Sequence, residues 1–304
     1  MGELVSLIRT SNIEEIKNSI YKILNTINFN KAQVSSVTIK PNLCNYWPSS
    51  TGYTTDPMVV AGIIDIIRER YGKSIPMRIV ESDASAMRTK YAFSALGYEK
   101  LSREKEVELF NLSKDRVVER EVKVNNRKIN LKIPSSLLNT DLFINVPKLK
   151  IMRETHITCA LKNIFGCIAL PRKSIYHPYL HETIVGINKI LCPNLTIVDG
   201  LVALGRCPVK LDLIMGSKDP FSIDWIASQI MGYNPSRIKI LRIAIKEKLG
   251  DPAGIEICGD ELNSFKSEFP KVSNSIPKLS WKIQLALINI YEKIVNDITP
   301  PELD

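Results

Sequence analysis

All three histidines of this 304-residue chain fall within one segment, residues 145–182, which is also rich in lysine. Histidine is the usual carrier of protons near neutral pH. A lysine surrounded by other lysines has its pKa lowered, so that its amine becomes a base or a nucleophile. We therefore expect the chemistry of the chain in this segment, and the catalytic candidates are His156, Lys162 and His177.

The lysines of the same segment predict a binding site for an anionic small molecule. Ammonium groups, together with free backbone amides at a helix start, favour a phosphate or a carboxylate. The alternative is that Lys162 and Asn163 only cap a helix and contact solvent. Thr51, in the glycine-bearing turn Thr51-Gly52, is a further candidate, although the turn matches no nucleotide-binding fingerprint. The ligand-binding candidates are Lys40, Asn42, Thr51, Lys148, Lys150, Asn163 and Asp199.

A metal site is a second interpretation of these residues. His156 and Cys159 are three residues apart and could share one helix face, with Cys167, His177 and His181 nearby in sequence. This spacing is no known ligand signature, and two of the cysteines flank an apolar helix, which favours a role as small buried hydrophobes. For a divalent metal the candidate ligands are Glu81, Asp83 and His156.

The elements that must position these side chains alternate between strands and helices. This order is typical of a mostly parallel sheet flanked by helices. Around Asn125 and Asn126 the pattern changes to apolar–polar alternation on both sides of a turn, which predicts a projecting antiparallel hairpin near 119–133. The predicted strands are 34–40, 77–80, 107–111, 141–146, 195–198 and 211–216, and the predicted helices are 13–27, 54–71, 89–96, one within 157–165, 182–190, 223–231, 236–249 and a C-terminal amphipathic helix at 281–295.

Polar residues follow four of the predicted strands. Open parallel sheets bind ligands beyond the carboxyl ends of their strands, so these residues are expected to converge at one edge. The simpler alternative is that strand ends are polar because they contact water. The segments concerned are 40–42, 81–83, 145–148 and 199–200.

Several motifs occur in an order that resembles the family known as domain of unknown function 362. They are KPNL at 40–43, TGYTTDP at 51–57, DLFINVPKLK at 141–150, HITCALKNIFG at 156–166, His177 and VDG at 198–200, and the resemblance covers roughly 37–259. It implies redox work, because members often carry or are fused to a ferredoxin-like segment with cysteines for four-iron clusters. This chain has six scattered cysteines without a C-x-x-C pair. Either it works without a cluster, or a separate ferredoxin supplies electrons.

The composition is that of a globular protein. Hydrophobic residues make up 44% and charged residues 24%, and no apolar run reaches the ~18 residues of a membrane span. The absence of a signal sequence predicts a cytoplasmic protein. We expect one α/β domain over 1–270, with a division into two lobes near 115–140 as an alternative, followed by a linker and helix over 271–304.

Three functions remain open from the sequence. The leading one is an enzyme that binds an anionic small molecule at the carboxyl edge of the sheet, with redox or isomerase chemistry suggested by the resemblance alone. The second is a non-catalytic partner that binds a metal or docks a ferredoxin. The third is a nucleic-acid binder, suggested by the net charge of +9 but disfavoured because basic residues are spread among acidic neighbours. The C-terminal helix is expected to dock a partner or form a homodimer.

Overall fold

The computed structural model describes residues 2–85 and 87–270, so the predicted C-terminal helix lies outside the described residues. The strands are β1 (Glu3–Arg9), β2 (Val37–Pro41), β3 (Met77–Glu81), β4 (Glu108–Asn111), β5 (Val117–Val124), β6 (Arg127–Pro134), β7 (Leu142–Val146), β8 (Lys148–Met152), β9 (His156–Thr158), β10 (Leu195–Leu204), β11 (Pro208–Ser217) and β12 (Ile255–Gly259). The α-helices are α1 (Ile16–Thr26), α2 (Pro57–Tyr71), α3 (Thr89–Ala95), α4 (Tyr98–Glu104), α5 (Ser135–Leu138), α6 (Ala160–Phe165), α7 (Leu180–Ile190), α8 (Pro220–Ile230), α9 (Lys239–Lys246) and α10 (Leu262–Glu268).

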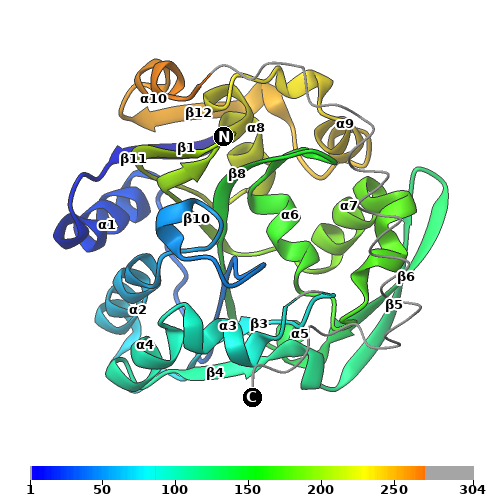
Figure 1. Ribbon diagram of the computed structural model, residues 1–304, viewed down its shortest axis with the longest axis horizontal. Coiled ribbons are helices and arrows are strands. Elements are labelled where there is room, and N and C mark those ends of the chain that lie inside the picture. The colour runs from blue at the N-terminus through cyan, green and yellow to red at the C-terminus, as the bar shows by residue number, and fades with distance from the viewer. Residues whose placement is uncertain (1, 86, 271–304) are drawn as a thin grey trace.

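A mostly parallel central sheet with helices on both faces forms the fold, as predicted (Figure 1). The strand order is β12-β1-β11-β10-β7-β2-β3-β4, and β8 joins through β10 and carries β9. The pairs β10–β7, β7–β2, β2–β3 and β3–β4 are all parallel, whereas β11 is antiparallel to both of its neighbours. The strands followed by polar residues in the sequence are therefore adjacent, and their carboxyl ends meet at one edge.

Two apolar cores lie on opposite faces of this sheet. Side chains alternate between the faces along a strand, so in β7 Phe143 joins one core and Ile144 the other. The core around Ile144 is closed by α1, α2, α3 and α4, and the core around Phe143 by α6, α7, α8 and α9. All five residues of β7 are buried, and all but Asn145 are apolar because both faces of the strand are covered.

The predicted hairpin is confirmed as the separate two-stranded sheet β5–β6. Asn125 and Asn126, at its tip, both have positive φ angles of 47° and 61°, as a two-residue type I′ turn requires. The hairpin packs against α7, where an added Cβ at Gly186 would lie 2.8 Å from Val122 Cγ1. It therefore extends the core of one face.

One strand at the site was not predicted from the sequence. Lys148 and Lys150 lie on β8, which continues from β7 after Pro147 alone. The strand forms because it pairs with the distant β10 and with β9. The buried ammonium groups of this strand therefore project from a rigid sheet.

Asp224 on α8 fixes the start of α6, the helix that carries two of the predicted site residues. Its carboxylate accepts hydrogen bonds from Ala160 N at 2.6 Å and Leu161 N at 3.2 Å. These amides are left without partners by the helix itself, and a carboxylate at a helix N-terminus is favoured by the dipole. Because α6 has only six residues, the cap that Asp224 provides from α8 helps to hold it in the core around Phe143.

The buried carboxyl of Asp224 predicts a pH dependence of stability. Burial raises its pKa from the usual 3.8 to about 7, against the effect of its backbone hydrogen bonds. Between these values the folded state holds a proton that the unfolded state lacks, so the free energy of unfolding falls as the pH rises through this window. Asp224→Asn should lose this component, measured by urea denaturation from pH 4 to 8. An unchanged slope in the variant would contradict the assignment.

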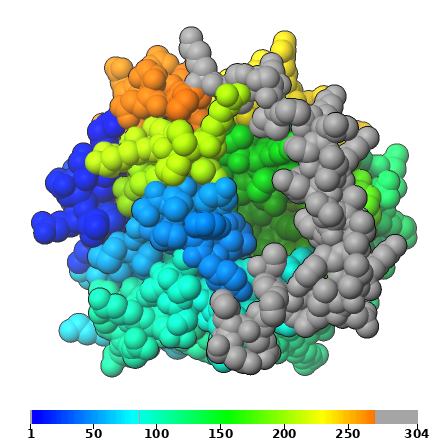
Figure 2. All heavy atoms as spheres, viewed as in Figure 1, coloured from blue at the N-terminus to red at the C-terminus, as the bar shows by residue number. Residues whose placement is uncertain are grey.

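Gly52 lets the segment before α2 approach β10 closely. It ends the 3-10 turn η2 (Ser49–Thr51) with φ of +78°, and an added Cβ would lie 2.7 Å from Ala203 O. Figure 2 shows this stretch of chain on the surface beside the segment around residues 200–215. Both the angle and the proximity favour glycine.

Gly52→Ala should therefore be clearly destabilising. Gly232 is a matched control, since its φ is +77° and no atom lies within 4 Å of an added Cβ. Both variants incur the cost of a left-handed alanine, roughly 1–2 kcal/mol. We expect Gly52→Ala to lower the free energy of unfolding by about 1–3 kcal/mol more than the control, because only there a methyl group meets backbone. Equal losses in chemical denaturation would show that the contact with β10 relaxes freely.

Candidate functional site

A cavity of about 470 Å³ lies beyond the carboxyl ends of β2 and β3. Its wall is completed by β8, by α6 and by the 3-10 segment η4 (Lys173–Tyr179). Leu43, Met87, Met152 and Phe165 give it an apolar part. The ionisable groups Lys40, Glu81, Lys150, Lys162, Lys173, His177 and Cys44 also line it.

Lys40 and Glu81 form a buried ion pair at the base of the cavity. The ammonium and the carboxylate are 2.8 Å apart, with side chains 1% and 5% exposed. The carboxylate also accepts from Leu43 N and Ser82 N, so its oxygens are well satisfied. A buried ion pair with this many hydrogen bonds compensates much of the desolvation cost of both charges. Glu81 is thereby committed to Lys40.

Lys150 has only neutral acceptors. Its Nζ donates to Asn42 Oδ1 at 2.6 Å and to Tyr53 O at 2.9 Å, and it lies 3.2 Å from Cys44 Sγ. The side chain is buried, and a buried ammonium without a carboxylate keeps an uncompensated positive charge. An anionic ligand in the cavity would compensate it.

Asn42 and Asn163 connect the two buried lysines. Asn42 Nδ2 donates to Asn163 Oδ1 at 3.1 Å, and Lys40 Nζ approaches the same oxygen at 3.5 Å. Asn163 Nδ2 donates to Asn145 Oδ1 at 2.8 Å. Asn163 is therefore buried and hydrogen-bonded to neighbouring side chains, and it does not contact solvent as a helix cap would.

Lys173 is a site residue that the sequence reasoning missed. Its Nζ donates to Ser82 Oγ at 2.8 Å and to Asp83 O at 2.6 Å, both neutral acceptors. Burial lowers the pKa of this ammonium from 10.5 to about 8, with Glu81 acting in the opposite direction. Its position four residues before His177 in the same polar segment was the signal that could have found it.

Lys162 and His177 lie together on the more open side of the cavity. Burial first, and then the charge of Lys150, lowers the pKa of Lys162, whereas Cys44 and Glu154 oppose the change. Partial desolvation first, and then Lys162, lowers the pKa of the exposed His177. Among the described residues, Lys162 Nζ has no hydrogen-bond or ion-pair partner, and it lies 5.3 Å from the ring centre of Phe165. Both groups are thus available to a ligand.

The charges of the cavity do not balance. In the described part of the chain, four lysines line it and Glu81 is the one carboxylate that does so. Because buried charges in proteins are usually paired, the excess of positive charge indicates a site for a negatively charged group.

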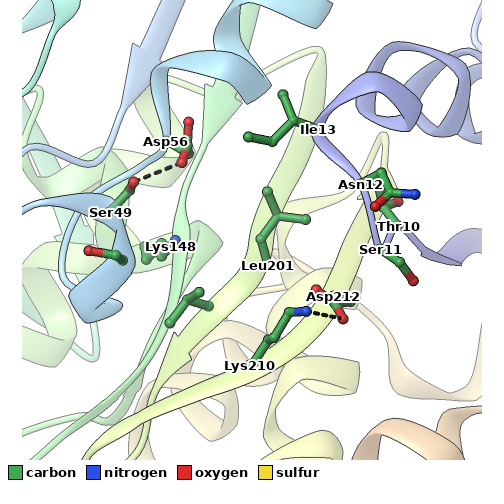
Figure 3. Close-up of a pocket in the computed structure, with 12 residues that line it drawn as sticks. Thr10, Ser11, Asn12, Ile13, Ser49, Asp56, Lys148, Leu201, Lys210 and Asp212 are labelled. Carbon is green, nitrogen blue, oxygen red and sulfur yellow. Dashed lines mark hydrogen bonds and ion pairs between the residues drawn. The ribbon is translucent and has the colours of Figure 1, made fainter.

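Lys148 and Asp199 form a second buried ion pair, outside the lining of the lysine cavity. Nζ and Oδ2 are 2.8 Å apart, and the same oxygen accepts from Asp56 N at 2.7 Å. Figure 3 shows Lys148 at a smaller hollow of about 220 Å³, where Ser49 donates to Asp56 and Lys210 pairs with Asp212. Lys148 is two residues from Lys150 in the sequence, but neither Lys148 nor Asp199 lines the cavity of about 470 Å³.

Three other candidates also lie outside the cavity lining. Thr51 Oγ1 donates to Pro48 O within η2. His156 is exposed on β9, with φ of +67° and its ring edge-on to Tyr233. Asp83 binds Thr89 N, at the start of α3, and Asn111 Nδ2.

The structure therefore does not bring Glu81, Asp83 and His156 together. Within residues 2–85 and 87–270, no group of three or more His, Cys, Asp or Glu side chains is placed to hold a metal ion. Cys159 and Cys167 are fully buried, as expected for small hydrophobic side chains.

Comparison with known proteins places the chain among α/β proteins. A thylakoid-associated protein of Synechocystis sp. is 26% identical over 235 residues, which cover 73% of this chain and 70% of that protein. The lactate racemase apoprotein of Thermoanaerobacterium thermosaccharolyticum superposes with a TM-score of 0.51 at 12% identity, over 74% of this chain and 56% of that one. The chain thus spans little more than half of the racemase, and the likeness shows the fold alone. A Thermotoga maritima protein gives a TM-score of 0.39 at 10% identity.

In the described residues no helix has both the length and the apolar character needed to cross a membrane.

The motifs that line the cavity fall within the region that defines a family. The family model described as Domain of unknown function (DUF362) matches residues 37–229, which include β2, β3, β7, β8, α6 and the cavity between them. The chain belongs to this DUF362 family.

Proposed function

We propose that this protein is an enzyme that binds a small molecule through its carboxylate or phosphate group and moves protons with Lys162 and His177. The observation that carries the proposal is the cavity lined by four lysines and one carboxylate. Its volume of about 470 Å³ suits a small ligand with a short apolar part. Lys150 and Lys173 hold the anion, because their described partners are neutral.

The proton carriers fit chemistry next to the bound anion. A lysine of lowered pKa works as a general base, and an adjacent histidine returns a proton. When a base removes a proton from the carbon beside a carboxylate, negative charge grows on the carboxylate oxygens, and nearby ammonium groups stabilise it. These residues supply both requirements of an isomerase-type reaction. A redox reaction would need an electron carrier such as a separate ferredoxin.

Homodimerisation through the C-terminal helix stays a prediction.

Removal of one cavity ammonium should weaken anion binding. We expect Lys150→Met to lower the affinity for succinate or inorganic phosphate on the order of tenfold or more, because hydrogen bonds to charged groups contribute about 1.5–3 kcal/mol. Isothermal titration calorimetry measures the change. Lys210→Met is the matched control, since Lys210 is exposed and lies outside this cavity. Equal affinities in wild type and Lys150→Met would refute the anion site.

The binding should also depend on pH through Lys173. Its pKa of about 8 means that the ammonium is charged below this pH and neutral above it. Succinate keeps its charge from pH 6.5 to 9, so its affinity should be flat at the low end and fall as the pH rises through 8. In Lys173→Met the decline near pH 8 should be absent. A decline that persists in this variant would assign the titration to another group.

A further inference from the structure

Cys44 occupies an unusual position for a thiol. It follows directly on the KPNL motif, lines the cavity and is exposed to solvent. Its Sγ lies 3.2 Å from Lys150 Nζ and 3.6 Å from Tyr53 O. The sulfur is therefore accessible to a ligand and in contact with a buried ammonium group.

A second lysine, Lys162, lines the same cavity. Burial first, and then the charge of Lys150, lowers the pKa of its ammonium group, and Cys44 acts in the opposite direction. Lys162 also lacks a hydrogen-bond or ion-pair partner within the part of the chain that the structure describes. One lysine thus contacts the thiol and a second lines the same cavity, in which four lysines face the one carboxylate of the described residues, Glu81.

Thiolates, not thiols, are the nucleophilic form of cysteine, and neighbouring ammonium groups favour the thiolate. Nucleophilic cysteines accordingly occur in partly exposed, electropositive surroundings. The same ammonium groups would hold the carboxylate of an incoming molecule beside the sulfur, and this proximity speeds a bond-forming step. The positive surroundings of Cys44 and its exposure to solvent therefore both favour a reaction with an anionic molecule.

We propose that Cys44 is a nucleophile of this site and forms a covalent bond with electrophiles that carry a carboxylate. The inference rests on the anion site of the proposed function and names the class of molecule that reacts there. With iodoacetate as probe, the thiol first loses its proton to solvent. A sulfur lone pair then forms the S–C bond while the C–I bond breaks, and iodide leaves with the bonding electrons.

The other cysteines provide internal controls. Burial raises the pKa of the Cys159 and Cys167 thiols, the latter to about 12, and both side chains are fully enclosed. Cys192 and Cys207 are exposed, and no hydrogen bond joins either sulfur to a lysine of the described residues. Cys207 is therefore the matched control, exposed but without the lysine contact.

The experiment measures alkylation of the full-length chain at each cysteine by peptide mass spectrometry, with iodoacetate and with neutral iodoacetamide. We expect the rate ratio of iodoacetate to iodoacetamide to be on the order of tenfold higher at Cys44 than at Cys207, because the lysines attract the carboxylate. Lys150→Met should lower this ratio at Cys44 and leave Cys207 unchanged. Lys162→Met serves as a second variant should the first fail to fold, and Cys44→Ser should abolish the adduct at this position.

The outcomes separate the two proposals. If Cys44 reacts no faster than Cys207 with either reagent while succinate still binds, the nucleophile is refuted and the anion site stands. If Cys44 reacts fast but equally with both reagents, the preference for a carboxylate is refuted, and the anion site loses its support with it. Fast, iodoacetate-selective alkylation that succinate slows would support both.

Discussion

The burial of ammonium groups at the carboxyl edge of the sheet is the constraint on which the rest of the site depends. Lys40 can be buried because Glu81 accepts from it and from two backbone amides. Lys150 is buried against an asparagine and a carbonyl, which satisfy its hydrogen bonds but leave its charge. Lys40, which has a carboxylate partner, therefore serves the fold, whereas Lys150, which has none, is available to bind an anion.

Neutral side chains connect the buried lysines to the neighbouring helix and strands. Asn163 contacts β2 through Lys40 and β7 through Asn145, so α6 is tied to two neighbouring strands. At its other end α6 is held by Asp224 of α8. A helix of six residues is too short to be stable alone, and these contacts hold Lys162 beside the cavity. The position of the proposed base therefore depends on residues far away in sequence.

Much of the fold follows from periodicity. The apolar patterns predicted α1, α2, α3, β3, β7, α7 and the β5–β6 hairpin within a few residues of their observed bounds. The sequence reasoning missed β9, a three-residue strand that pairs with the neighbouring β8. It also missed β1, β8 and β12, because these strands pair with distant partners, as β1 does with β12 and β8 with β10. Local sequence carries no signal for such pairing. The strands that were predicted sufficed to place the polar ends of β2, β3, β7 and β10 at one edge.

The sequence by itself determined the class of fold, the family and the segments that meet at the sheet edge, because periodicity and local motifs are properties of neighbouring residues. Only the tertiary structure decided which charges are neutralised. It paired Lys148 with Asp199 and Lys40 with Glu81, and it left Lys150, Lys162 and Lys173 without a carboxylate partner among the described residues. It also placed His156 on the surface and Cys44 against Lys150. Pairing and burial depend on distances between residues far apart in the chain, which are set when the sheet and its helices pack together.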